Sequence, residues 1–412
     1  REQVLSHFNL LVSLFAGSRS GEVEEEIRRL LRLLLAQIGE NRPAISVGLS
    51  LGVPPIFSAG KPGSSQQDLS SFSDRAREAH DLVFSAVKNV YKTTLRGMAP
   101  GNLLLLLCPS ADGELRAQAE MLTEFPLANV VSSDVCDRLM FSGEGLSLPI
   151  QEGTLRPTVD VDGVAHINMP RMAFESMGDE EKLFELLQEN MKLISVAFVS
   201  KARYLERFNG QTVDKQKRNF VVAPAGLFEA VRQLTHSSPP NSDDSRSLMM
   251  KICQSMSEHL HKVSTSDLRI RLSSNSSLSA AERFAKADIG KYGFSSVSKI
   301  IYQTDRESAT YSYCMIPLEE HLGTEKQLKL EREMHRYING GHYTLIQLRE
   351  TEEDLAEDRL AHLLQEAFSQ PGIDVLGFIH PLTVCRSCGG ISLGVESKCD
   401  SCASRDVSVY RR

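Results

Sequence analysis

Three features that many binding proteins use are absent or scarce in this sequence. Tryptophan is absent, and aromatic residues make up only 6% of the 412 residues, so few side chains are available to stack on bases or anchor interfaces. A basic excess is absent too: the net charge is −7, which excludes a broad electrostatic contact with nucleic acid or anionic membrane. Long apolar runs are also missing. The run from Leu103 to Leu107 is five residues long, against roughly 20 for a membrane helix.

The length of the chain exceeds the usual limit for one hydrophobic core, so we expect two or three lobes or one large barrel. The chain opens at Arg1 with neither an initiator methionine nor a signal peptide. We therefore expect a cytoplasmic protein whose sequence is cut from a longer one.

Apolar periodicity predicts an alternation of strands and helices. Spacing at every second residue, as in Ile45, Val47 and Leu49, is typical of a strand, and the stripe within 179–207 is typical of an amphipathic helix. The expected strands span 44–53, 103–108, 128–131, 163–168, 220–223, 268–272, 342–348 and 374–379. The expected helices span 22–35, 74–93, 113–123, 179–207, 227–234, 280–288 and 354–368, with a polar linker at 235–246. This alternation predicts an α/β architecture.

The last four of the eight cysteines are spaced in close pairs. Two residues separate Cys385 from Cys388, two separate Cys399 from Cys402, and ten lie between the pairs. Each pair can aim two sulfurs at one point, and two pairs complete the tetrahedron that zinc prefers. Without an export signal the pattern favours a metal over disulfides, with iron as the chemical alternative. Four thiolates leave no open coordination position, so a structural ion is expected.

Segments around the cysteines resemble one known family. They are Tyr337-Ile-Asn-Gly-Gly-His-Tyr-Thr-Leu-Ile-Gln-Leu, Gly377-Phe-Ile-His-Pro-Leu-Thr-Val-Cys385 and Arg405-Asp-Val-Ser-Val-Tyr410. They resemble the C-terminal part of the anaerobic (class III) ribonucleoside-triphosphate reductases, which are glycyl-radical enzymes. Further segments match in the order of the family, from Ala128 to Tyr410. These are Ile167-Asn-Met-Pro-Arg171, Gly178-Asp-Glu-Glu-Lys-Leu-Phe184, Gly226-Leu-Phe-Glu-Ala-Val231 and Arg283-Phe-Ala-Lys-Ala-Asp288.

The resemblance implies a partial α/β barrel of the glycyl-radical-enzyme type as the catalytic domain at 1–380, followed by a small zinc-ribbon lobe at 381–412. It implies anaerobic reduction of ribonucleoside triphosphates to deoxyribonucleoside triphosphates for DNA synthesis. In the family a glycyl radical takes a hydrogen atom from a cysteine, the thiyl radical abstracts the ribose 3′ hydrogen, and the 2′ hydroxyl leaves as water. Implied partners are the substrate, nucleotide effectors, a radical S-adenosylmethionine activase and a second copy of the chain in a homodimer. The sequence does not choose between formate and a thiol system as reductant.

Two residues are candidates for catalysis. Cys136 stands where the resemblance places the radical cysteine, although a lone cysteine is by default a buried apolar residue. Asn168 ends a strand that should point into the barrel, where an amide could bind a ribose hydroxyl. The alternative for Asn168 is capping of the turn before Pro170.

The remaining cysteines and several histidines suggest no chemistry. Cys108, Cys253 and Cys314 lie in apolar contexts and are expected to pack in the core. The histidines are expected to be satisfied locally, none being paired with a carboxylate at ligand or triad spacing. They are His166, His342 and His380.

Two parts of the family pattern are not matched. The Arg-x-x-Gly-Tyr loop that carries the radical glycine does not occur before Arg412, and 273–277 reads Ser-Ser-Asn-Ser-Ser where the family shows a Glu/Thr/Pro-rich active-site strand. We therefore expect a fragment without the N-terminal region and the radical loop, or a non-catalytic reductase-like protein that binds a partner through its ribbon. A third possibility, a zinc-ribbon nucleic-acid binder, conflicts with the acidic charge and scarce aromatics, so no direct nucleic-acid contact is expected.

Overall fold

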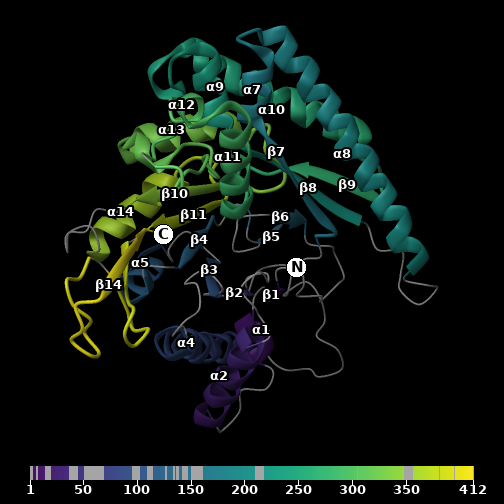
Figure 1. Ribbon diagram of the computed structural model, residues 1–412. Coiled ribbons are helices and arrows are strands. Elements are labelled where there is room, and N and C mark those ends of the chain that lie inside the picture. Colours follow the sequence, from purple (N-terminus) through teal and green to yellow (C-terminus); the bar gives the residue numbers. More distant parts are fainter. Residues whose placement is uncertain are drawn as a thin grey trace. The chain divides into compact units, whose positions relative to one another are not determined.

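The chain forms two compact units of mixed α/β structure (Figure 1). The computed structural model describes residues 3–5, 8–13, 20–36, 45–50, 69–94, 103–108, 115–125, 128–132, 135, 139–141, 147–149, 161–208, 218–303, 305–347, 356–379, 381–393 and 395–411. The first unit holds 1–143, 149–159 and 345–412, and the second holds 144–148 and 160–344. The α/β class is therefore confirmed. Closure of the strands into a barrel and the domain limits 1–380 and 381–412 stay predictions.

The first unit is built on a sheet with the strand order β1-β2-β3-β4-β11-β10. Strands β1 to β4 pair in parallel, and β11 pairs antiparallel to β4. The strands are β1 (Gln3–Leu5), β2 (Ile45–Ser50), β3 (Leu103–Cys108), β4 (Asn129–Val131), β10 (Tyr343–Gln347) and β11 (Val375–Ile379). The helices are α1 (Phe8–Ser13), α2 (Ser20–Ala36), α4 (Leu69–Thr94), α5 (Leu115–Glu124) and α14 (Glu357–Phe368). Leu105, Leu106 and Leu107 of β3 are buried, so this part of the strand is covered on both faces, as expected for a central parallel strand.

A small antiparallel ribbon follows at the C-terminal end. Its strands are β12 (Pro381–Cys385), β13 (Ile391–Leu393) and β14 (Val407–Arg411), in the order β13-β12-β14. Two further short strands are β5 (Leu139–Phe141) and β6 (Ser147–Pro149). The ribbon is where the four paired cysteines lie.

The second unit is built on three parallel strands, β7 (Gly163–Asn168), β8 (Arg218–Ala225) and β9 (Leu268–Leu272). Parallel neighbours require crossover connections, which helices provide here. From β7 to β8 these are α7 (Met169–Ser176) and α8 (Glu180–Phe208), and from β8 to β9 they are α9 (Leu227–Thr235), the 3-10 turn η2 (Pro239–Asn241) and α10 (Asp243–Val263). The elements after β9 are α11 (Leu278–Tyr292), α12 (Phe294–Val297), the 3-10 turn η3 (Leu318–Glu320) and α13 (Thr324–His335).

This parallel sheet brings three chain segments to one edge. Asn168 pairs in register with Ala225, and Val222 with Leu272, so the carboxyl ends of the three strands lie together, as Figure 1 shows. Side chains of the helices pack against the sheet and form the core. The rings of Phe198 on α8 and Phe220 on β8, for example, stack with centroids 4.5 Å apart. Full burial of one such side chain contributes about 2 kcal/mol to folding.

Within the described residues the predicted strands and helices are present, but the predicted linker at 235–246 is wrong over its last four residues. Helix α10 begins at Asp243, and the Ser242 side chain caps it by accepting from the Ser245 N–H. The polar Ser/Asp stretch that suggested a linker is thus a helix start, because a capping serine and early acidic residues stabilise that end of a helix. Among the described helices, none is long and apolar enough to cross a membrane.

Candidate metal centre and candidate active site

The four cysteines lie on two knuckles with the same backbone pattern. In the first, the Gly389 N–H donates to the Cys385 carbonyl and the Cys385 N–H to the Gly390 carbonyl, both at 2.9 Å. In the second, the Ala403 N–H donates to the Cys399 carbonyl and the Cys399 N–H to that of Ser404, both at 2.8 Å. Gly389 and Ala403 occupy equivalent left-handed positions, with φ of 70° and 58°.

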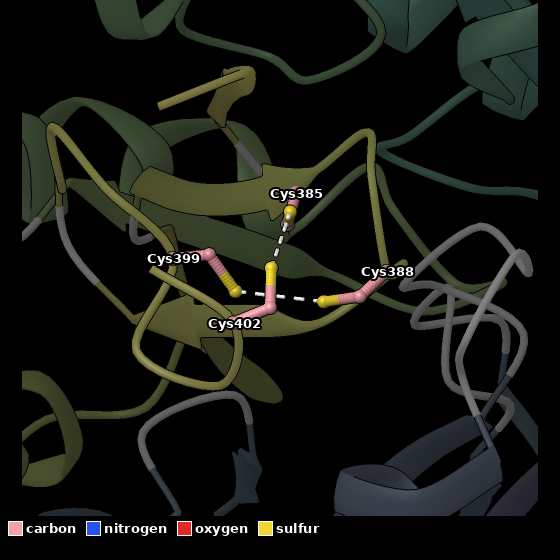
Figure 2. Close-up of side chains that lie close together, drawn as sticks. All are labelled: Cys385, Cys388, Cys399 and Cys402. Atoms are coloured by element: carbon pink, nitrogen blue, oxygen red, sulfur yellow. Dashed lines mark hydrogen bonds between the residues drawn. The ribbon is translucent and has the colours of Figure 1, made fainter. Parts of the chain in front are cut away.

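This backbone brings the four sulfurs to one point (Figure 2). All four Sγ atoms lie within 4.8 Å of one another, and the Sγ atoms of Cys385 and Cys402, like those of Cys388 and Cys399, are 3.6 Å apart. A zinc–sulfur bond of about 2.3 Å in a tetrahedron requires sulfurs about 3.8 Å apart. The cluster can therefore hold one metal ion such as zinc.

A side chain on the residue after the first knuckle, Gly390, would crowd two of the sulfurs. A Cβ atom on Gly390 would lie 3.2 Å from the Cys388 Sγ and 3.3 Å from the Cys399 Sγ. The bare backbone instead lets the Gly390 N–H donate to the Cys388 Sγ at 3.4 Å. Backbone donors of this kind favour the thiolate form of a metal ligand.

The pKa values of Cys385 and Cys402 are shifted in opposite directions. Backbone N–H groups, that of Cys388 foremost, lower the pKa of Cys385 to about 6. Although the Ser404 N–H acts to lower it, the neighbouring thiols of Cys388 and Cys385 raise the pKa of Cys402 to about 12. A cation between the four sulfurs would offset the repulsion between neighbouring thiolates, because it stabilises all four at once.

A second polar cluster lies at the carboxyl edge of the β7–β9 sheet, around Asn168. Its Oδ1 accepts from the Arg171 N–H at 3.1 Å, which caps α7. Its Nδ2 donates to Oδ2 of Asp288 at 2.8 Å. The capping role considered for Asn168 is therefore confirmed, and the amide has a second, long-range partner.

Asp288 is the centre of this cluster. It is fully buried, and its Oδ1 accepts from Nε of Arg171 at 2.7 Å and from Nη2 at 2.6 Å. Its Oδ2 accepts from the Tyr311 hydroxyl at 3.1 Å as well as from Asn168. Four donors satisfy both oxygens, as a buried carboxylate requires. No local pattern in the sequence marks Arg171 or Asp288 as a site residue, although each ends one of the segments that carry the resemblance.

The Gly226 segment packs against the same edge. Gly226 has φ of +68°, and a Cβ atom there would lie 2.5 Å from Cγ of Pro170. Three residues on, buried Glu229 accepts from the N–H and the hydroxyl of Ser312, both at 2.6 Å. Burial raises the pKa of the Glu229 carboxyl to about 7. Three segments of the resemblance, 167–171, 226–231 and 283–288, therefore meet at one edge.

The serine-rich stretch 273–277 also leaves the sheet here, directly after β9. Ser273, Ser274, Asn275 and Ser276 are buried, which is unusual for a polar loop. The Ser277 hydroxyl lies 3.4 Å from Nε2 of His166. Burial, followed by the nearby charge of Arg283, lowers the pKa of His166 to about 4.

The expectation that no histidine is paired with a carboxylate is wrong for His342. Its Nε2 lies 3.0 Å from Oε2 of Glu331, and both side chains are buried. The sequence concealed the pair because its members lie on different elements, α13 and the stretch before β10. His380 and Cys136 lie outside the described residues.

The three remaining cysteines are buried, as predicted. Burial raises the pKa of Cys108 and of Cys253 to about 12 and raises that of Cys314 well above its usual range. Thiols in such environments are unreactive.

Comparisons with known proteins agree on one family. Residues 119–412 match the sequence model of the anaerobic ribonucleoside-triphosphate reductases, and no curated protein matches the sequence. A solved anaerobic ribonucleotide reductase is similar with a TM-score of 0.73 at 16% identity, covering 100% of this chain and 67% of that one. The Thermotoga maritima anaerobic ribonucleotide reductase with dATP in its specificity site gives 0.72 at 17%, covering 100% and 72%. Its complex with dATP and CTP gives 0.70 at 15%, covering 100% and 70%.

At these identities the solved structures show a shared fold. The family model adds the sequence evidence, because it spans more than half of the chain and includes the four cysteines, Asn168 and Asp288. The chain therefore belongs to the anaerobic ribonucleoside-triphosphate reductase family.

Proposed function

We propose that this protein reduces ribonucleoside triphosphates to deoxyribonucleoside triphosphates under anaerobic conditions. The observation that carries the proposal is the contact of Asn168 with Asp288 at the carboxyl edge of the β7–β9 sheet. Ligands of parallel α/β sheets bind at such edges. The proposed wider fold is the partial barrel of glycyl-radical enzymes, with a catalytic domain at 1–380 and the ribbon at 381–412.

The hydrogen bonds of Asn168 restrict what it can do. An amide side chain offers two donors and two acceptor lone pairs. Arg171 occupies one lone pair and Asp288 one N–H, so one N–H and one lone pair remain to contact a ribose hydroxyl. Asn168 therefore orients the substrate and transfers no proton.

Cys136 is the proposed radical cysteine, on the basis of its place in the order of motifs ahead of Ile167. When present, the glycyl radical supplies the unpaired electron. Cys136 gives up its S–H hydrogen atom, its sulfur takes the ribose 3′ hydrogen, and it returns a hydrogen atom to C3′ after the 2′ hydroxyl has left as water. Two electrons come from formate or a thiol system. The chemistry needs a dry site to protect the radical intermediates.

The four-cysteine cluster is proposed to hold one structural zinc ion. Four sulfur ligands leave no position for water or substrate, so the ion does not act as a Lewis acid. The ribbon at 381–412 has three short strands in its described residues, and a segment of this size is too small to fold independently on an apolar core. The metal would therefore stabilise the ribbon.

The proposed partners follow from the family. The Thermotoga maritima enzyme has been solved with dATP and CTP, and we propose that this chain likewise binds substrate and effector nucleotides. A radical S-adenosylmethionine activase, a homodimer and a cytoplasmic location complete the proposal.

The first test is calorimetric titration of the whole chain with CTP. Asn168→Ser keeps a capping oxygen for α7 but removes the amide donor, so the dissociation constant should rise about tenfold, equivalent to about 1.4 kcal/mol. Asn190→Ser, an exposed amide on α8, is the matched control and should bind CTP like the wild type. Absence of CTP binding to the wild-type chain, or equal binding by Asn168→Ser, would contradict the proposal.

The second test addresses the radical cysteine in the complete gene product after anaerobic activation. Cys136→Ser should abolish reduction of CTP because the serine O–H bond is too strong to relay a radical. Cys253→Ala, which changes a buried packing cysteine, should retain it. Residual turnover by Cys136→Ser would place the radical elsewhere.

A further inference from the structure

A buried hydrogen-bond network outside the Asn168–Asp288 cluster centres on Glu331 of α13. Its Oε2 accepts from the Thr344 hydroxyl at 2.5 Å and lies 3.0 Å from Nε2 of His342, while its Oε1 accepts from Nε2 of Gln327 at 3.2 Å. All four side chains are buried, and the rings of His335 and His342 stack with centroids 5.5 Å apart. A carboxylate taken so far from water must be held by its partners in a fixed position.

Glu331 holds the chain on both sides of Tyr343. Successive side chains of an extended segment point to opposite sides, so His342 and Thr344 can both reach Glu331 while their common neighbour faces away. The backbone around Tyr343 is thereby fixed. Its N–H donates to the Ser274 hydroxyl at 2.9 Å, and the Gly341 carbonyl accepts from the Ser274 N–H at 3.1 Å.

The segment 339–343, which we call the clasp, is also bonded along the end of β9. The Gly340 N–H donates to the Leu272 carbonyl at 2.7 Å, and the Leu272 N–H donates to Oδ1 of Asn339 at 2.9 Å. A Cβ atom on Gly340 would lie 2.8 Å from the Leu272 oxygen, and Gly341 has φ of 110°. Both glycines are therefore required for the clasp to lie this close to the strand.

The loop that the clasp holds, 273–277, leaves β9 at the edge where Asn168 lies. Five consecutive Ser and Asn residues have little apolar surface to hold them in place, and ordering each residue costs about 1 kcal/mol of backbone entropy. Contacts from outside the loop must offset that cost. The clasp provides two of them at Ser274, and the Tyr313 carbonyl provides another by accepting from the Ser276 N–H at 2.9 Å.

We propose that Glu331 is a positioning residue: through His342 and Thr344 it fixes the clasp, and through the clasp it holds the 273–277 loop in shape for nucleotide binding at the sheet edge. The nucleotide part of this inference rests on the proposed function, whereas the ordering of the loop does not. Glu331 acts through other residues and does not touch the substrate.

The test removes the network without leaving a buried charge. In Glu331→Leu/His342→Leu both partners become apolar groups of similar size, which is often nearly neutral for stability. Thr344→Val is a second, milder variant that removes one hydroxyl donor. Leu330→Ala is the matched control, because Leu330 is a buried core residue on the same helix whose loss destabilises the unit without touching the network.

Hydrogen–deuterium exchange of the peptide covering 272–277 is the first measurement. We expect exchange about tenfold faster than wild type in the double variant and a smaller, selective increase in Thr344→Val, with the rest of 160–344 unchanged. Leu330→Ala should speed exchange evenly across the unit. Wild-type protection of the loop in the folded double variant would overturn the proposal. Should the double variant not fold, wild-type protection in Thr344→Val would do the same.

Calorimetric titration with CTP is the second measurement. The dissociation constant of the double variant should rise at least about fivefold, and that of Leu330→Ala should not change. Equal affinity of the double variant and the wild type would refute the role in nucleotide binding. If the wild-type chain does not bind CTP, the proposed function fails, and the exchange measurement still decides whether Glu331 orders the loop.

Discussion

Arg171 and Asp288 are 117 residues apart in the sequence, yet two nitrogens of the Arg171 guanidinium lie within 2.7 Å of one Asp288 oxygen. The pair joins the start of α7 to the middle of α11 at the edge where the three parallel strands of the second unit end. Asn168 and Tyr311 share the other oxygen of the same carboxylate. One buried charge therefore joins β7, α7, α11 and the segment that carries Tyr311.

Replacing Asp288 should destabilise the second unit strongly. Asp288→Asn leaves the Arg171 charge without its counter-charge and presents an amide N–H to other donors, so we expect a loss of about 3 kcal/mol. Tyr311→Phe, which removes one neutral donor to the same carboxylate, should cost about 1 kcal/mol. Urea unfolding measures both, and a smaller loss for Asp288→Asn than for Tyr311→Phe would contradict the central role of Asp288.

Two glycines of the second unit should respond oppositely to alanine. Gly226→Ala forces a methyl group to within 2.5 Å of Pro170 at φ of +68°, so it should cost at least about 2 kcal/mol. Gly290→Ala lies in the last turns of α11 with nothing within 4 Å of the new Cβ, so it should stabilise the protein by up to about 1 kcal/mol. Thermal unfolding distinguishes them, and similar melting temperatures would show that the approach of Pro170 is unimportant.

Glu229 should make the stability of the second unit depend on pH. Burial raises the pKa of its carboxyl from 4.5 to about 7, so the unfolded chain releases this proton first. The stabilisation is complete below about pH 4.5 and is lost as the pH rises to about 7, by on the order of 3 kcal/mol. Glu229→Gln cannot ionise and should remove this loss.

The measurement compares urea unfolding of wild type and Glu229→Gln at about pH 5 and about pH 8. The comparison with the variant is needed because burial lowers the pKa of His166 to about 4, which adds stability as the pH rises to about 6.5. The difference between the two proteins isolates Glu229. A difference that does not change with pH would show that Glu229 titrates normally in the fold.

Removing the metal should unfold the ribbon. We expect one zinc per chain by elemental analysis. Cys388→Ser should lower the zinc content to well below one because the serine oxygen is a poor replacement for a thiolate, whereas Cys253→Ala should keep it. An excess of chelator should speed amide exchange in 381–411 and leave exchange in the second unit unchanged. Iron in place of zinc, or no metal, would contradict the proposed ion.

Local patterns in the sequence were sufficient for much of the fold. The strands around Val47 and Leu105 and the helix at 179–207 follow from apolar spacing, which depends on near neighbours alone. Helix α10 was missed because Ser242 and Asp243 suit a linker as well as a helix start. The apolar face from Leu248 to Leu260 distinguishes a helix from a linker. Its role is evident in the structure, where it packs in the core.

The sequence by itself determined the metal site, because Cys385, Cys388, Cys399 and Cys402 need only two short turns to converge, and turn geometry is local. The order of motifs also determined the family. Only the tertiary structure decided the partners of the buried charges: Asp288 with Arg171 and Asn168, Glu229 with Ser312, and Glu331 with His342. Their spacing along the chain follows no period, because each pair is brought together by the crossing of different elements. The packed fold excludes water from these carboxylates, so each must accept its hydrogen bonds from donors within the protein.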